Sequence, residues 1–190
     1  MKAFDTVSHK RLLLKMRSYN IRSSIIGWIA NFLKCRTQYV MVNESASSEK
    51  PVLSGIPQGS VLGPLLFVIY INDLPDYVLS DTYLYADDTK MYRIISDETD
   101  QLQLQADLYK LQDWSKTWLL QFHPDKCKVM SIGKCKAIKE YKFSSNDDVP
   151  VLEHVKSEKD IGIIIDDKLD FKEHINEKVK KANRINNGGN

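Results

Sequence analysis

The sequence predicts an α+β domain in which helices cover one face of an antiparallel sheet. Two patterns predict it: apolar residues recur at helical spacing in several segments, and short runs rich in β-branched and aromatic residues are bounded by turn-forming residues. The 190 residues, 43% of them hydrophobic, are enough to bury the core of one domain. The formal net charge of +2 is too small to identify a binding partner, because binding follows local patches of charge.

The chain is expected to begin with a strand, two helices and a hairpin. KAFDTVSH, residues 2–9, looks like a strand that leads into a helix. Apolar residues at three- and four-residue spacing then predict helices over 8–19 and 23–33. Short strands at 37–42 and 51–53 flank a polar loop, which predicts a hairpin.

A glycine-rich loop runs into an apolar helix at residues 54–67, SGIPQGSVLGPLLF, and the helix is expected to end near Asp73. Its three glycines have two interpretations. Either they let the backbone approach another group closely, or they mark a flexible helix entry. The residue pattern leaves both interpretations open.

Two adjacent acids interrupt the next predicted hairpin. In YLYADDTKMY, residues 83–92, Asp87 and Asp88 separate a strand over 82–86 from a strand over 89–95. Adjacent side chains of a strand point to opposite faces, so both carboxylates reach one site only where a tight turn breaks the alternation. Carboxylate oxygens suit Mg²⁺, but solvated turn acids are the commoner arrangement, and this stretch alone leaves both open.

The second half of the chain is expected to hold a long helix, two strands and a final helix. The long helix spans 98–120, the strands cover 128–132 and 160–165, and the last helix spans 171–185, ahead of a Gly-Gly end that is expected to fray. The apolar residues of the long helix are predicted to be core: Leu102, Leu104, Leu108, Leu111, Trp114, Trp118 and Leu119.

Cysteine content and hydropathy exclude several classes of protein. Cys35, Cys127 and Cys135 are an odd number without paired spacing, which argues against a disulfide framework and a structural zinc site and suits a reducing compartment. No apolar run approaches the roughly 20 residues of a spanning helix, and the N-terminus lacks a signal-peptide pattern. We therefore expect no membrane segment and an intracellular protein of the cytoplasm or nucleus, not a secreted one.

Four stretches, in this order, carry a resemblance to a known family: KAFDTVSH at 2–9, SGIPQGSVLGPLLF at 54–67, YADDT at 85–89 and DIGIIIDDKLDFKEHI at 160–175. Together they resemble the palm of reverse transcriptases from non-LTR retrotransposons, particularly jockey- and CR1-like elements, and the resemblance covers nearly the whole chain. It implies a polymerase palm with partial fingers over residues 1–170 and the beginning of a thumb over 171–190.

The resemblance gives the two hairpin acids a role. In that family the Asp pair of the hairpin binds the catalytic ions, which implies that Asp87 and Asp88 are the catalytic and metal-binding residues, with two Mg²⁺ ions and Mn²⁺ as a substitute. The implied reaction is RNA-templated DNA synthesis, in which a primer 3′-hydroxyl attacks the α-phosphate of a deoxynucleoside triphosphate and pyrophosphate leaves. The implied partners are an RNA template, a DNA primer and deoxynucleoside triphosphates.

Residues near the first two stretches match nucleotide-binding positions of the family. Gln58 and Gly59 match a loop that contacts the template and the incoming nucleotide, and Phe4 matches an aromatic gate at the nucleotide's 2′ position. The family's first stretch reads Asp-x-x-Lys-Ala-Phe-Asp, and its first Asp is the third metal-binding carboxylate. Here the lysine is Lys2, so that Asp would stand two residues before Met1. We therefore expect either a truncated copy or an incomplete gene model, and a chain that polymerises poorly or not at all by itself.

The C-terminal part matches further positions of the family. Lys126 stands where the family places a lysine near the nucleotide phosphates, although His123 replaces the usual Asn. Ile161 and Gly162 match a hairpin that grips the primer end. These residues are therefore expected to contact nucleotide and primer.

Three other interpretations remain. A viral RNA-dependent RNA polymerase normally shows Gly-Asp-Asp, and a group II intron maturase fits the stretch GPLLFVIYINDLP less well. A non-catalytic nucleic-acid-binding remnant of a mobile element belongs to another class of function. A cluster of lysines has two interpretations: either it contacts phosphates, which favours this remnant, or it forms a solvated face of the domain. The cluster consists of Lys126, Lys128, Lys134, Lys136, Lys139 and Lys142.

Overall fold

The structure, a computed structural model of the 190-residue chain, describes residues 3–133, 140–143 and 151–187. It confirms the α+β class, because helices and small two-stranded sheets both recur along the described chain. The chain forms two structural units, Met1–Phe122 and His123–Asn190. The long helix and both predicted acids belong to the first unit.

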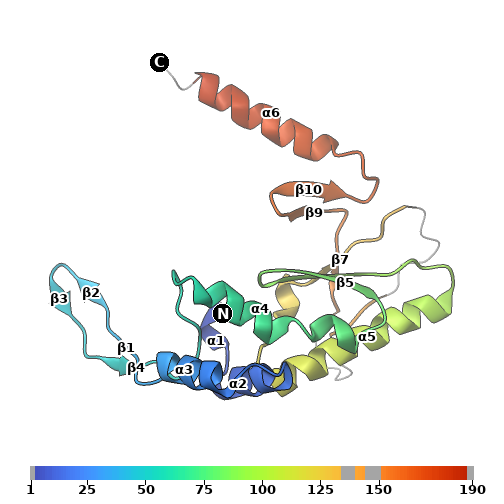
Figure 1. Ribbon diagram of the computed structural model, residues 1–190. Helices are drawn as coiled ribbons and strands as arrows, with labels where there is room; N and C mark the ends of the chain where they lie inside the picture. The colour runs from blue at the N-terminus through green and yellow to red at the C-terminus, as the bar shows by residue number, and fades with distance from the viewer. Residues whose placement is uncertain (1–2, 134–139, 144–150, 188–190) are drawn as a thin grey trace. The chain divides into compact units, whose positions relative to one another are not determined.

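The helices of the first unit lie close to the segments that periodicity predicts. Ser8 caps the helix that begins at His9, since its hydroxyl accepts the N–H of Arg11 at 3.5 Å. The helices, labelled in Figure 1, are α1 (Ala3–Thr6), α2 (His9–Ser18), α3 (Ser23–Leu33), α4 (Leu62–Ile71), the 3-10 turn η1 (Leu74–Tyr77) and α5 (Glu98–Trp118).

The strand expected at residues 2–9 is wrong, because Ala3–Thr6 form the single turn α1. The Thr6 hydroxyl donates to the Ala3 carbonyl at 3.0 Å, which closes this turn. The carbonyls of Phe4 and Val7 accept backbone N–H groups from the glycine-rich loop, not from a neighbouring strand. Tertiary hydrogen bonds to that loop thus replace the sheet partner that a strand would need.

The core of the first unit lies between α2, α3, α4 and α5. α2 packs on both α3 and α4, and α5 packs on η1. Its apolar members are buried: Val7, Leu12, Met16, Ile26, Ile29, Leu33, Ile56, Leu66, Phe67, Tyr70, Ile71, Leu74, Leu108, Leu111, Trp114 and Leu120.

A buried lysine joins three of these helical segments. Lys15 of α2 is 1% exposed, and its ammonium donates to the Tyr70 carbonyl and pairs with the Asp73 carboxylate. The ammonium also lies 3.9 Å from the ring centroid of Trp118 and 4.6 Å from that of Trp114. Burial lowers the pKa of Lys15, and the bond and charge of Asp73 oppose that change. A charge at this depth requires such partners.

Two of the residues predicted as core on α5 are exposed. Leu108, Leu111 and Trp114 are buried, whereas Leu102 and Leu119 are 54% and 51% exposed. Leu102 precedes Leu108 by six residues, which places the two side chains about 120° apart around a helix of 3.6 residues per turn. Leu119 follows the helix with a left-handed φ of 54°, which takes it off the apolar stripe.

The long hairpin between α3 and α4 confirms the expected pair of strands. β1 (Thr37–Gln38) pairs with β4 (Lys50–Pro51). β2 (Met41–Val42), which belongs to the predicted strand 37–42, pairs with β3 (Ser45–Ala46) in the segment expected to be a loop. Figure 1 shows these four strands as one projecting arm of the first unit.

The hairpin predicted around the two adjacent acids is present, shifted by one residue. β5 (Asp81–Tyr85) pairs antiparallel with β6 (Asp88–Tyr92), so Asp88 is the first residue of its strand and only Asp87 shares the turn with Ala86. The prediction that β6 extends to residue 95 is wrong, since pairing ends where Asp81 faces Tyr92.

The second unit contains η2 (Pro124–Lys126) and a parallel pair, β7 (Lys128–Val129) with β8 (Glu153–His154). β7 is therefore shorter than the strand predicted over 128–132. Predicted strand 160–165 is wrong, because this segment is a hairpin of β9 (Ser157–Asp160) and β10 (Ile163–Asp166). Its two turn residues, Ile161 and Gly162, have φ of 45° and 83°, which reverses the chain. The final helix is α6 (Lys172–Asn187).

A single antiparallel sheet is not present among the described residues. They form five two-stranded sheets, four antiparallel and one parallel. Within the same described ranges, no helix is both long and apolar enough to cross a membrane.

Candidate active site

Asp87 and Asp88 lie at the tip of the β5–β6 hairpin. Tyr85 faces Asp88 in the last pair of the ladder, and the turn is possible because Ala86 adopts a left-handed φ of 52°. Both aspartates are exposed, and neither carboxylate makes a hydrogen bond or ion pair with another described residue. The tip therefore presents two adjacent carboxylates that no protein cation among the described residues neutralises.

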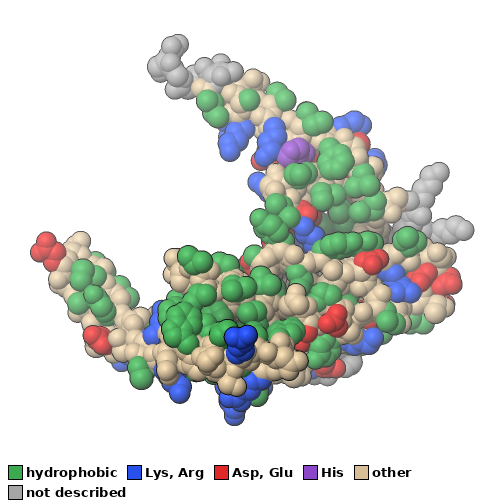
Figure 2. All heavy atoms as spheres, in the orientation of Figure 1, with side chains coloured by type: hydrophobic (Ala, Val, Ile, Leu, Met, Phe, Trp, Pro, Cys, Tyr) green, Lys and Arg blue, Asp and Glu red, His purple; other side chains and the backbone are tan. Residues whose placement is uncertain are grey.

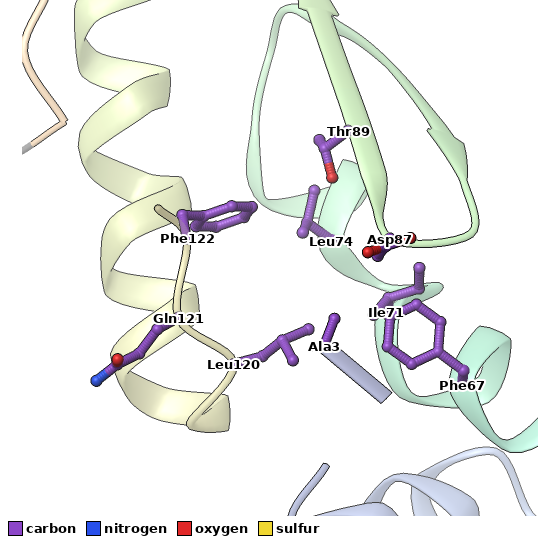
Figure 3. A pocket seen from close by; sticks show the side chains of 9 residues that line it. All are labelled: Ala3, Phe67, Ile71, Leu74, Asp87, Thr89, Leu120, Gln121 and Phe122. Atoms are coloured by element: carbon purple, nitrogen blue, oxygen red, sulfur yellow. The ribbon is translucent and has the colours of Figure 1, made fainter. Parts of the chain in front are cut away.

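The two carboxylates of the tip have different surroundings. Asp87 and Thr89 line a cavity of about 50 Å³, whereas Asp88 lies opposite Tyr85 on the exposed face of the hairpin. Figure 3 shows Asp87 at the bend of the hairpin, beside Ile71. Only Asp87 therefore faces this cavity. The remaining lining residues are Ala3, Phe67, Leu74, Leu120, Gln121 and Phe122.

Two tyrosines stiffen the hairpin behind the acids. The rings of Tyr83 and Tyr92 stack with centroids 5.6 Å apart, and their hydroxyls lie 3.3 Å apart. The hydroxyl contact with Tyr83, together with partial desolvation and the charge of Asp81, raises the pKa of Tyr92 to about 12. Tyr92 is therefore uncharged at neutral pH.

Phe4 packs beside the cavity, against the helix α4 that lines it. Its ring stacks on Phe67 of α4 with centroids 4.3 Å apart and planes 12° apart, and Phe4 is half-buried. Ala3 of α1 lines the cavity directly. The structure thus brings Phe4 near Asp87 through their shared neighbour Phe67.

The glycine-rich loop is tied to α1 by polar contacts. Gln58 donates its side-chain amide to the Asp5 carboxylate at 2.6 Å, and the Ser54 hydroxyl donates to the Asp5 carbonyl at 3.0 Å. His9 Nε2 lies 2.6 Å from the Gly55 carbonyl. These contacts hold the predicted template-binding residue Gln58 against the turn that carries Phe4.

Two glycines of this loop fit the first interpretation, close approach of the backbone to another group. A Cβ on Gly63 would lie 2.6 Å from the Pro57 carbonyl, and a Cβ on Gly55 would lie 2.9 Å from the Asp5 backbone. These two glycines permit close packing of the chain on itself. Gly59, with φ of 76°, has nothing within 4 Å of its Cβ position, so it turns the chain toward open space.

Sequence reasoning missed Asp5, His9 and Phe67 as members of this site. Two of them meet their partners across a long stretch of sequence: 53 residues for Asp5 with Gln58 and 46 for His9 with Gly55. No local periodicity encodes such contacts. All three residues lie in stretches that carry the family resemblance, 2–9 and 54–67, and this is the signal that could have suggested them.

The remaining predicted residues belong to the second unit. Lys126 ends η2 and is exposed, and its N–H bonds the His123 carbonyl at 2.9 Å. Ile161 is 57% exposed, and the Cβ position of Gly162 has nothing within 4 Å. The tip of the β9–β10 hairpin is therefore open, and the roles of Lys126, Ile161 and Gly162 remain predictions.

The lysine cluster that favours a nucleic-acid-binding remnant is only partly described. Lys128 pairs with Glu158 at 2.8 Å, which offsets its charge, and Lys142 also interacts with neighbours. Lys134, Lys136 and Lys139 lie outside the described residues.

The cysteines and acids offer no further metal site in the described part of the chain. Cys35 and Cys127 are free thiols, and burial raises the pKa of Cys127, while Cys135 lies outside the described residues. Within the described ranges, no group of three or more His, Cys, Asp or Glu residues is arranged to hold a metal ion.

Comparison with known proteins gives these features a family context. The model of a family described as reverse transcriptase (RNA-dependent DNA polymerase) matches residues 1–179. In Drosophila melanogaster, the RNA-directed DNA polymerase from mobile element jockey is 33% identical over 91% of this chain. The probable polymerases from transposons X-element and BS of the same fly are 31% and 29% identical over 91% and 95% of the chain. The chain spans only 19% of the jockey and X-element relatives and 21% of the BS relative.

Proposed function

The chain belongs to the reverse transcriptase (RNA-dependent DNA polymerase) family, and on that premise we propose that it takes part in RNA-directed DNA synthesis through Asp87 and Asp88. The observation that carries the proposal is the pair of exposed, unneutralised carboxylates at the tip of a two-stranded hairpin. Like charges this close are unfavourable unless a cation or solvent offsets them. A functional cation site explains why this turn holds two acids.

The donor chemistry of the tip fits a hard divalent cation. We propose that Asp87 and Asp88 hold Mg²⁺, with Mn²⁺ as a substitute, because carboxylate oxygens are the ligands these ions prefer. A bound ion would stabilise the attacking and leaving oxygens of phosphoryl transfer. Mg²⁺ is commonly held by one or two carboxylates together with substrate phosphates, so the nucleotide would complete the ligand set.

The residues around the hairpin would position the nucleotide and the template. Phe4 is held by stacking on Phe67, so its ring keeps a fixed place beside the cavity that Asp87 lines. The Gln58 amide keeps its orientation through Asp5, and Gly59 leaves the backbone accessible beside it. We assign Phe4 to the sugar of the nucleotide, and Gln58 and Gly59 to the template and incoming base.

The second unit would supply contacts to phosphates and primer. Lys126 is an exposed cation, which suits the nucleotide phosphates. The open tip of the β9–β10 hairpin, Ile161 and Gly162, would contact the primer end. RNA template, DNA primer and deoxynucleoside triphosphates are the proposed substrates.

Primer extension tests the proposal. The purified chain is incubated with an RNA template, an annealed DNA primer, deoxynucleoside triphosphates and Mg²⁺, beside its Asp87→Asn/Asp88→Asn variant. We expect at most weak incorporation from the chain by itself, and any incorporation should require the metal and be lost in the double variant. Asp81→Asn is the matched control, because it removes negative charge from the far end of the same hairpin and should keep the activity.

A metal-binding readout separates loss of the site from loss of other parts of the polymerase. Electron paramagnetic resonance measures how much Mn²⁺ the chain binds in the presence of nucleotide. The amount of bound Mn²⁺ should decrease in the double variant and stay the same in Asp81→Asn. Equal Mn²⁺ binding in all three proteins would contradict the assignment of Asp87 and Asp88 as ligands.

A further inference from the structure

Positive charge is concentrated in the first part of the chain. Residues 1–50 contain nine Lys and Arg against three Asp and Glu, whereas the whole chain has 27 against 25. Of these three acids, Asp5 is bonded to Gln58, Glu44 lies in the projecting hairpin arm, and Glu49 directly precedes Lys50 in that arm. The small net charge of the chain therefore conceals a strongly basic segment.

Five exposed cations of this segment form what we call the basic face: Lys10, Arg17, Arg22, Lys34 and Lys50. Lys10 and Arg17 are seven residues apart on α2 and so share one side of that helix. Arg22 precedes α3, Lys34 follows it, and Lys50 lies at the root of the arm. Figure 2 shows Lys and Arg side chains along the edge formed by α2 and α3.

None of these five side chains forms an ion pair with a described residue. Lys128 and Lys172 of the second unit, in contrast, pair with Glu158 and Asp170. Clustered cations that lack internal partners make the local electrostatic potential positive and attract an anionic partner. The basic face therefore has charge available for binding.

Exposed aromatic rings accompany the cations. Trp28 of α3 is 57% exposed and is held by stacking on Phe32, with centroids 5.9 Å apart and planes 9° apart. Tyr39, just after β1, is 54% exposed. Flat exposed rings beside cations are the combination that binds single-stranded nucleic acid, since bases stack on the rings while cations contact phosphates.

The basic face is distinct from the candidate active site. In Figure 1, α2 and α3 lie along the lower edge of the first unit, and β5 lies on the other side of α4. α2 packs on α4 through its buried side, so its exposed side points away from that helix. A strand on the basic face would therefore not be the primer end at Asp87 and Asp88.

We propose that the basic face is a second binding surface for single-stranded RNA, separate from the hairpin that carries Asp87 and Asp88. An anionic membrane or an acidic protein would also be attracted by the cations. The aromatic rings favour RNA, because base stacking gives them a role that neither alternative requires. The surface would hold a length of RNA beyond the part that is being copied.

Fluorescence anisotropy of a labelled oligouridylate tests this surface on the full chain. Lys10→Gln/Lys34→Gln should weaken binding several-fold and reduce the slope of log K against log salt by about 1.4, or about 0.7 for each phosphate that a lysine no longer neutralises. Lys116→Gln/Lys168→Gln removes the same charge from exposed positions elsewhere and should leave both quantities unchanged. Equal effects of the two double substitutions would overturn the proposal.

Trp28→Ala provides a second test that does not alter charge. Removal of the ring on which one base stacks should weaken binding about five-fold or more while the salt slope stays constant. Tyr77→Ala is the control, because Tyr77 is an exposed ring of η1 outside the basic face. Circular dichroism establishes that each variant keeps its helices. Unchanged affinity in a folded Trp28→Ala variant would contradict the stacking role.

Two outcomes separate this proposal from the proposed function. The parent chain fails to extend a primer if the polymerase proposal is wrong. Oligouridylate binding by that chain, kept in Asp87→Asn/Asp88→Asn and weakened in Lys10→Gln/Lys34→Gln, would still support the basic face. Preferential binding to phosphatidylserine vesicles over oligouridylate, abolished in Lys10→Gln/Lys34→Gln, would assign the surface to a membrane and overturn the RNA proposal.

Discussion

The side-chain amide of Gln58 donates a hydrogen bond of 2.6 Å to the carboxylate of Asp5, across 53 residues of sequence. Asp5 lies on α1 beside Phe4, and Gln58 lies in the glycine-rich loop. The bond couples the two segments that would enclose an incoming nucleotide. It gives Asp5 a positioning role, because it acts through Gln58.

Asp5→Ala should free the Gln58 side chain, whereas Asp5→Asn should hold it, since the Asn carbonyl can still accept. If the chain extends primers, KM for the deoxynucleotide should rise more in Asp5→Ala than in Asp5→Asn. The side-chain amide resonances of Gln58 in ¹⁵N NMR report the bond independently of activity. Identical Gln58 resonances in both variants and the parent chain would contradict this hydrogen bond.

Gly63→Ala should destabilise the first unit, because the new Cβ would lie 2.6 Å from the Pro57 carbonyl and must push the loop away. The expected loss in free energy of unfolding is about 1–3 kcal/mol, typical of overpacking. Gly27→Ala is the matched control on α3, where a Cβ meets nothing within 4 Å. It should stabilise by up to about 1 kcal/mol through helix propensity. Urea unfolding followed by circular dichroism measures both.

Lys15→Met should be strongly destabilising, since it leaves the Asp73 carboxylate without its buried cation. Removal of one partner of a buried ion pair typically costs about 3–5 kcal/mol. Lys10→Met, on the exposed side of the same helix, should change the free energy of unfolding by less than about 0.5 kcal/mol. Comparable urea midpoints for the two variants would show that the aromatic rings around Lys15 tolerate its replacement.

Asp107 of α5 should make stability depend on pH in acid. Its buried carboxylate accepts the Ser80 N–H and hydroxyl, both at 2.8 Å, and the Leu79 N–H at 3.2 Å. Burial alone would raise the pKa of Asp107, but these donors and Lys110 outweigh it and lower the pKa below that of an ordinary Asp. Because the folded pKa is the lower one, the stabilisation is full above the unfolded pKa and is lost as pH falls through the folded value.

At pH 7 the free energy of unfolding of Asp107→Asn, measured by urea unfolding, should therefore be about 2–3 kcal/mol lower than that of the parent chain. This difference should shrink below about pH 4. Asp113→Asn is the control, because Asp113 lies on the same helix with a side chain that is 75% exposed. A difference between parent and Asp107→Asn that stays constant from pH 7 to acid would contradict the assigned charge state.

Local pattern was sufficient for the longer helices and, to within one residue, for the turn of the β5–β6 hairpin. α2 and α3 match the predicted segments because their apolar side chains repeat at the helical period and face one core. The two adjacent acids of the hairpin were found from the sequence because a break in an apolar strand pattern is itself a local signal. Their chemistry as ligands, and the intracellular location, remain predictions.

Tertiary structure decided what no local pattern contains. Residues Ala3–Thr6 are helical because the glycine-rich loop, not a strand, bonds carbonyls in and next to this turn. The loop approaches this turn closely at Gly55, where a Cβ would lie 2.9 Å from the Asp5 backbone. The single residue Ala86 sets which aspartate faces the cavity, since its left-handed backbone places Asp87 in the turn and Asp88 on the strand. By itself the sequence determined most of the elements and the residues that carry chemistry. Contacts across about fifty residues decided which of those residues meet.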